Sequence, residues 1–133
     1  MGRRRRNRRT PVVVVVGAVL LTGCASASEP EVERVAATFE DPSGDPGARC
    51  DLLAPATLAA FEQDVSAACT DAVQDLPLDG GSVESVEIWG GNAQVQLTGD
   101  TVFLTETSAG WRITSAACTP RAEAPYDCEV DGP

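Results

Sequence analysis

The sequence predicts a small exported α+β domain in which N-terminal helices pack on a four-stranded antiparallel meander sheet, with two disulfides. Three observations predict this class. Apolar residues recur at helical spacing between Val32 and Val73, they alternate with polar residues from Ser82 onward, and four cysteines remain to pair once Cys24 is set aside. From Cys24 to Pro133 there are 110 residues, enough for one domain with a modest core.

The residues ahead of Cys24 have the order of an export signal. Arginines dominate residues 3–9, and an apolar run of ten residues follows from Val12 to Leu21. A helix needs about 20 apolar residues to span a bilayer, so this run predicts a signal rather than a membrane span. Residues 1–23 are therefore expected to be a signal peptide and are left out of the fold.

Cys24 is predicted to be the site of lipid attachment. Leu21-Thr22-Gly23-Cys24 resembles the lipobox of bacterial lipoprotein signals, in which the cysteine receives a diacylglyceryl group before cleavage. Two alternatives stay open: cleavage after Ala25-Ser26-Ala27, and an uncleaved anchor. Each alternative exports the domain. The lipobox places it on the extracytoplasmic face of the cell membrane, with residues 24–28 as a short lipidated tether.

The charge of the exported part limits its partners. Four arginines remain after Cys24 against all 20 carboxylates, which gives a net charge of −16. Such a surface repels phosphate backbones and anionic headgroups, so we expect no nucleic-acid partner and a membrane link through acyl chains alone. A cationic partner stays open, beside the simpler alternative that the acidity only maintains solubility.

The four remaining cysteines form an even set in an exported chain, which favours disulfides. Three pairings are possible, and we expect neighbours to pair: Cys50 with Cys69 and Cys118 with Cys128. Each bond is worth about 2–4 kcal/mol through its limit on the unfolded chain. A four-cysteine zinc site is disfavoured because no C-x-x-C pair is present, and no metal or cofactor is expected.

The first helix is predicted to start at a capping box, Ser28-Glu29-Pro30-Glu31. One helical face then carries Val32, Val35, Ala36 and Phe39, while Glu31, Glu33, Arg34 and Glu40 are expected elsewhere. A tether of about Ala25 to Ala27 would hold the domain close to the membrane.

A second helical region follows the turn-rich stretch 41–47. Residues 48–76 are helical in composition, and Pro55 is expected to end one short helix at Leu53 or Ala54 and to begin the next. The Cys50–Cys69 bond would then link neighbouring helices. Pro77 and Gly80-Gly81 close the region.

Four strands are predicted after Ser82, separated by turns at residues 90–92, 99–100 and 108–110. The run Val102-Phe103-Leu104 is apolar on both faces, as expected of a central strand. Residues 120–133 are predicted to be a proline-punctuated tail that the Cys118–Cys128 bond folds back on the last strand.

Helices followed by strands reading "VEIWGGNAQVQL", "TVFLTE" and "GWRITSAAC" resemble the cone-shaped fold of nuclear transport factor 2-like proteins. The chain also resembles small lipoproteins of high-GC Gram-positive bacteria that end in segments like "GWRITSAACTPRAEAPYDCEV". The similarity covers about Glu29 to Val130. It implies a cone-like domain over residues 29–119, with a curved sheet wrapped on the helices and a pocket at its open end. It implies no single activity.

Catalytic chemistry is disfavoured by the absence of histidine, which excludes Ser-His-Asp and Cys-His arrangements. The one tyrosine, Tyr126, is expected to pack rather than to act as a general acid. Residues 127–132, "DCEVDG", match only the first half of a calcium loop and predict an acidic, disordered terminus instead.

The aromatic residues are the remaining candidates for a site. Phe61, Trp89, Phe103 and Trp111 are predicted either to fill the core or to line a ligand or partner surface. Trp89 precedes a glycine turn, where an indole is often partly exposed. We therefore expect a non-enzymatic, lipid-anchored binding or protein-interaction module of the cell envelope. The alternatives are a carrier of a small apolar ligand and an enzyme using pocket carboxylates.

Overall fold

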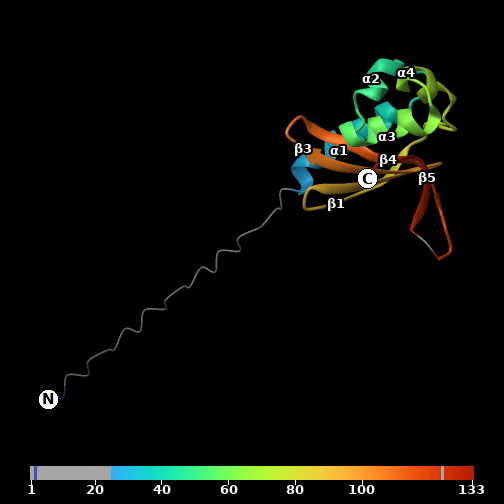
Figure 1. Cartoon of the computed structure of the whole chain (residues 1–133). Coiled ribbons are helices and arrows are strands. Elements are labelled where there is room, and N and C mark those ends of the chain that lie inside the picture. The colour runs from blue at the N-terminus through green and yellow to red at the C-terminus, as the bar shows by residue number, and fades with distance from the viewer. Residues whose placement is uncertain (1, 3–24, 124) are drawn as a thin grey trace.

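The computed structural model describes residues 2, 25–123 and 125–133, so the predicted signal peptide and Cys24 lie outside the described residues. These residues build four helices, α1 (Ala25–Glu40), α2 (Pro46–Cys50), α3 (Pro55–Val65) and α4 (Cys69–Ala72), and then a 3-10 turn, η1 (Val73–Asp75). Five strands follow (Figure 1): β1 (Val83–Trp89), β2 (Asn92–Leu97), β3 (Thr101–Thr107), β4 (Gly110–Pro120) and β5 (Tyr126–Asp131). Over these described ranges, no helix is long and apolar enough to cross a membrane.

Helix α1 buries the predicted apolar face. Its members are each at most 1% exposed: Val32, Val35, Ala36 and Phe39. Its extent differs from the prediction. Ser28 lies inside the helix rather than at its start, and residues 25–27, expected to be a tether, are helical. Alanine is the strongest helix former, and two of these three residues are alanine. The described helix therefore begins at the residue next to Cys24.

Helix α2 is shorter than predicted. The Asp45 side chain caps its start by accepting a hydrogen bond from the backbone N–H of Ala48 at 2.8 Å. The helix ends at Cys50 because residues 52–54 turn to run beside β4: Ile113 N donates to Leu52 O, and Ala54 N donates to Ile113 O, both at 2.8 Å. Pro55 begins α3, as predicted.

The sheet is an antiparallel meander in the order β1-β2-β3-β4-β5, with hairpins at the predicted turns. The prediction of four strands was wrong by one. Residues 126–131, expected to be a tail, pair with β4, and Cys118 lies opposite Cys128. The prolines do not prevent this pairing, because Pro120 is the last residue of β4 and Pro125 precedes β5.

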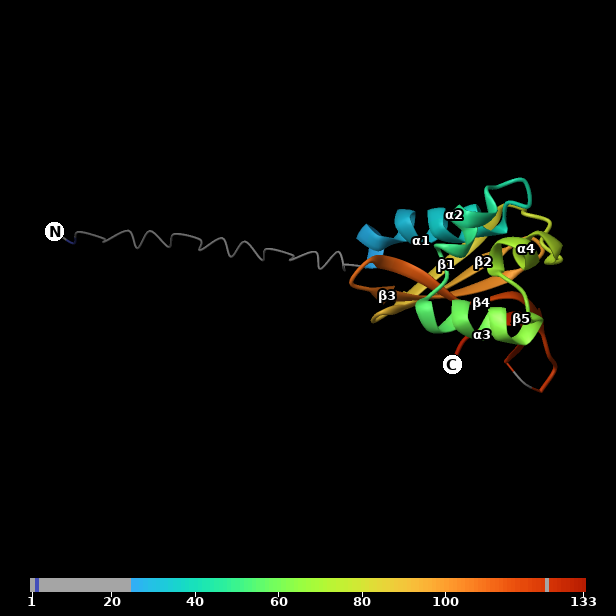
Figure 2. The ribbon, with the colours of Figure 1, turned by 45° about the horizontal axis from the view of Figure 1, so that its top comes forward.

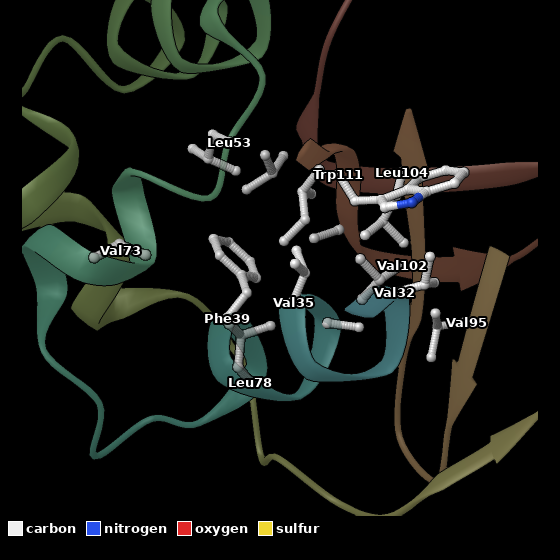
Figure 3. Packing of buried hydrophobic residues seen from close by; sticks show 14 of the residues in the cluster. Val32, Val35, Phe39, Leu53, Val73, Leu78, Val95, Val102, Leu104 and Trp111 are labelled. Carbon is white, nitrogen blue, oxygen red and sulfur yellow. The ribbon is translucent and has the colours of Figure 1, made fainter. Parts of the chain in front are cut away.

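Both predicted disulfides are present, Cys50–Cys69 and Cys118–Cys128. The first joins α2 to α4, and the second joins β4 to β5. Figure 3 shows the core, where the buried face of α1 meets the sheet; Trp111, 2% exposed, is its largest buried side chain. In the view of Figure 1 the helices gather on one side of the sheet.

Helix α1 runs between two ends of the sheet. Near its start, Glu31 Oε1 accepts a long hydrogen bond of 3.4 Å from the backbone N–H of Trp111, next to the β3–β4 turn. The backbone N–H of Glu106 on that hairpin donates to Gly91 O in the β1–β2 turn at 2.8 Å. The two turns and the first half of α1 are called the hairpin end; Figure 2 shows α1 starting beside the β3–β4 turn. The opposite end holds the β2–β3 turn and the start of β5.

Candidate functional site: an acidic groove

Two adjoining surface hollows lie away from the hairpin end, each with a volume of about 360 Å³. The disulfide hollow lies beside the Cys118–Cys128 bond and the β2–β3 turn, and Asp100, Asp127 and Glu129 contribute to its lining. The helix hollow lies between α3, α4, η1 and β5. Pro77 and Glu129 line both hollows. We call the two together the acidic groove, and this side of the molecule the groove end.

The groove is negatively charged and has an apolar floor. Among the described residues its lining includes no arginine and five carboxylates: Asp71, Asp75, Asp100, Asp127 and Glu129. One of these charges is partly balanced, because Arg121 pairs with Asp127 at the surface. Phe61 and Leu76 contribute apolar surface to the helix hollow, and Val65, 42% exposed, also lines it.

Both disulfides fix walls of this groove. The Cys118–Cys128 bond lines the disulfide hollow directly. The Cys50–Cys69 bond holds the start of α4, where Glu62 Oε1 also accepts a hydrogen bond from the backbone N–H of Cys69 at 2.9 Å. Asp71 and Asp75 follow in α4 and η1, so their positions depend on this anchored helix start.

Asp100 supports the wall of the disulfide hollow. Its carboxylate is 9% exposed and accepts backbone hydrogen bonds from Thr101 (2.6 Å), Ala117 (2.8 Å) and Cys118 (2.6 Å). Ala117 has a φ of 54°, a left-handed conformation that is unfavourable for alanine. The three bonds compensate that cost and tie the β2–β3 turn to β4.

Glu40 lies behind Asp100 as the last residue of α1, and it is fully buried. As a carboxylate it finds no hydrogen-bond donor among the described residues. Its pKa is raised from 4.5 to about 9, first by burial, then by the hydrogen bond its acid form gives to Asp100 and by the charge of Asp100. Asp79 raises this pKa further, and Arg49 lowers it. At neutral pH Glu40 is therefore a neutral acid.

Arg49 is the buried cation of this region, at 1% exposure. Its Nε donates to the Phe39 carbonyl at 2.8 Å, and its guanidinium lies 5.5 Å from the centroid of the Phe39 ring. Burial lowers its pKa, while the charges of Glu40 and Asp41 raise it. Arg49 thus satisfies a carbonyl at the end of α1 and holds that helix end in place.

The aromatic residues singled out from the sequence do not form one surface. Phe61 is 2% exposed and lines the groove, and Trp111 lies in the core. Phe103 packs edge-to-face on Tyr126 with ring centroids 5.0 Å apart. Trp89 is 49% exposed at the hairpin end. Tyr126 thus makes an aromatic packing contact.

Glu40, Arg49 and Asp100 were missed by reasoning from the sequence. A signal existed for Glu40, since it lies four residues after Ala36 and continues the buried face on which we did not expect it. For Asp100 the sequence showed only a turn. The prediction of a disordered terminus at the calcium-loop fragment was wrong, because Asp127 to Asp131 form part of β5. No cluster of three or more potential metal ligands occurs within the described ranges.

No protein family, no curated protein and no solved structure matches the chain.

Proposed function

We propose that the protein is a lipid-anchored, extracytoplasmic binding module of the cell envelope, and that its acidic groove binds a cationic segment of an envelope protein. The observation that carries the proposal is the groove itself: in the described part of the chain, five carboxylates and no arginine line two adjoining hollows that share Pro77 and Glu129. This arrangement deepens the earlier expectation of a binding module by naming the chemistry of the partner.

The groove suits a partner that is both basic and apolar. A lysine or arginine of the partner can lay its aliphatic stem over Val65 and Leu76 and bring its charged end to Asp71 or Asp75. Exposed ion pairs contribute only about 0–1 kcal/mol each, so charge alone gives weak binding. Burial of the apolar floor supplies the remainder, at about 25 cal/mol for each Å² removed from water.

The anchor is part of the proposal. The lipobox-like stretch 21–24 supports lipidation of Cys24, and the helix that begins at Ala25 supports a domain held directly at the membrane. Replacing Cys24 with alanine is expected to move the protein from the membrane fraction to the soluble fraction. An unchanged membrane fraction would contradict lipid attachment at this residue.

We also propose the finer architecture, a cone of the nuclear transport factor 2-like type with a curved sheet, related to small lipoproteins of high-GC Gram-positive bacteria. The order of elements supports it, because helices precede an antiparallel meander that packs against α1. A fold of this type hosts many activities, so the binding proposal does not depend on it.

The groove can be tested with a defined probe, a fluorescent amphipathic peptide of alternating lysine and leucine, titrated into the mature chain. Neutralising two groove carboxylates with Asp71→Asn and Asp75→Asn is expected to weaken binding by about tenfold, equivalent to about 1.4 kcal/mol. The matched control carries Glu84→Gln and Glu87→Gln, two exposed acids of β1 that do not line the groove. Equal weakening in both double variants would refute a specific groove site.

The same titration separates the proposal from one of its two alternatives, the ligand carrier. A carrier of a small apolar ligand would use the apolar surface of the helix hollow at Val65 and Leu76, so its affinity would be insensitive to salt and to the Asp71 and Asp75 changes. The other alternative, an enzyme that uses pocket carboxylates, is disfavoured because the two buried carboxyl groups are not free to react. Glu40 is shielded from solvent, and both oxygens of Asp100 accept backbone hydrogen bonds.

A further inference from the structure

Trp89 is an exposed aromatic residue, and packing of the core does not account for its position. Among the described residues, only Trp89 and Val65 are large apolar side chains with marked exposure, at 49% and 42%. Val65 lines the groove, whereas Trp89 ends β1 at the opposite end of the molecule, directly before the Gly90-Gly91 turn. The residues of the two hairpin turns at this end, 90–92 and 108–109, are also exposed.

The hairpin end is also where the rest of the chain joins the domain. Helix α1 begins at Ala25, one residue after Cys24, and the ten-residue apolar run ends at Leu21. Glu31, less than two turns into α1, contacts the backbone of Trp111, and the β3 end of that hairpin contacts Gly91 beside Trp89. A lipid on Cys24 or a retained apolar run would therefore hold this end of the domain close to a membrane.

We propose that the hairpin end lies on the lipid surface, with the Trp89 indole in the membrane interface and the acidic groove facing away from it. The inference rests on the proposed membrane anchor. An indole has an apolar body and one N–H donor, which suits the boundary between acyl chains and headgroups.

The charges at this end define which lipid surface fits. Glu31, Glu87 and Glu106 are exposed near the two turns, and the cation on this hairpin is Arg112, which lies on β4 opposite Thr105. The net negative charge opposes anionic headgroups, so burial of the indole rather than charge attraction provides the contact. We therefore expect the contact to be strongest on zwitterionic lipid and, on anionic lipid, to strengthen as salt screens the repulsion.

This orientation separates the two binding surfaces. Helix α1 has 16 residues, so it spans about 24 Å at 1.5 Å per residue. Its C-terminal residue, Glu40, belongs to the groove end. The groove would stand on the order of 20 Å above the lipid, accessible to a partner in the envelope.

The test uses the membrane-attached protein reconstituted into phosphatidylcholine vesicles that contain brominated phosphatidylcholine, which quenches nearby indoles. The chain has two tryptophans, and Trp111 is buried. Wild-type fluorescence is expected to fall by about a third or more, whereas the Trp89→Phe variant, which reports Trp111 alone, should change little. A matched variant, Trp89→Phe with Val65→Trp, moves the exposed indole to the groove end and should remain unquenched.

Flotation of the same vesicles separates the claim that the protein is anchored from the claim that the hairpin end faces the lipid. Quenching of the wild type but not of either variant supports the inference. Wild-type protein that floats with the vesicles and is not quenched, or an equally quenched Val65→Trp variant, overturns the orientation while leaving the anchor intact. Protein that fails to float at all refutes the anchor and the orientation together.

Discussion

The hairpin end and the groove end each expose one large apolar side chain, yet they are held together by different forces. At the hairpin end the contacts include backbone hydrogen bonds, such as Glu106 N to Gly91 O. At the groove end they include two disulfides and a buried set of ionisable groups, Glu40, Arg49 and Asp100. We infer that the groove end is built to keep a fixed shape, as a binding surface requires.

The largest expected difference between the ends is their response to pH. Unfolded chain releases the Glu40 proton near pH 4.5, whereas the folded protein keeps it to about pH 9. Folding therefore binds a proton between these values. The contribution of Glu40 to the free energy of unfolding is fully present below pH 4.5 and falls as pH rises toward 9, by up to about 1.4 kcal/mol per pH unit. Glu40→Gln keeps a neutral donor beside Asp100 and should remove this slope.

Urea unfolding of wild type, Glu40→Gln and the exposed control Glu87→Gln at several pH values between 5 and 9 measures that slope. The control is expected to follow the wild type. Parallel profiles for all three proteins would show that Glu40 is not protonated in the folded state.

The two tryptophans near the hairpin end differ in burial, so their substitutions are expected to differ in their effect on stability. Trp111 is 2% exposed in the core, so Trp111→Ala is expected to cost about 3–5 kcal/mol. Trp89→Ala should change stability by no more than about 0.5 kcal/mol, because the indole is half exposed. Thermal and urea unfolding check both values. A large loss from Trp89→Ala would mean that Trp89 supports the fold rather than a docking surface.

The disulfides should matter for the groove and not for the lipid contact. Replacing Cys118 and Cys128 with alanine removes a bond between residues separated by 10 positions, and the expected cost is about 3 kcal/mol. Binding of the lysine–leucine peptide should weaken, while quenching of Trp89 by brominated lipid should persist. Loss of both properties would indicate that the two ends are not independent.

The smallest of these effects is expected at Asp100. An asparagine there keeps one acceptor oxygen but turns an amide N–H₂ toward a backbone donor, at a cost of about 2 kcal/mol. The matched control, Asp127→Asn, alters an exposed carboxylate of the same groove and should stay within about 0.5 kcal/mol. Equal stability of the two variants in urea unfolding would contradict the supporting role of Asp100.

Local sequence signals sufficed for much of the fold. Alternating residues and glycine turns predicted four strands and their hairpins, and nearest-neighbour pairing predicted both disulfides. Strand β5 was missed because Val130 is its one buried apolar residue and acids surround it. Its pairing depends on the length of β4, which the local pattern does not reveal.

The groove could not be predicted, because its lining comes from α3, α4, β5 and the β2–β3 turn, which are distant in sequence. Asp100 has the sequence context of an ordinary turn, and its burial depends on β4 passing over it. Glu40 was placed on the wrong face because its charge outweighed its spacing from Ala36. A buried acid is costly unless it is neutral, and Asp100, whose charge helps to raise the pKa of Glu40, is remote in sequence.

The most direct test of the account is photo-crosslinking in intact cell envelopes, with a benzophenone amino acid placed either at Val65 in the groove or at Ala109 in the β3–β4 turn. Both positions are exposed, and they lie at opposite ends of the domain. The account predicts a discrete protein adduct from Val65 that the Asp71→Asn and Asp75→Asn changes abolish, and a lipid adduct from Ala109. Lipid adducts from Val65, or the same adducts from both positions, would contradict it.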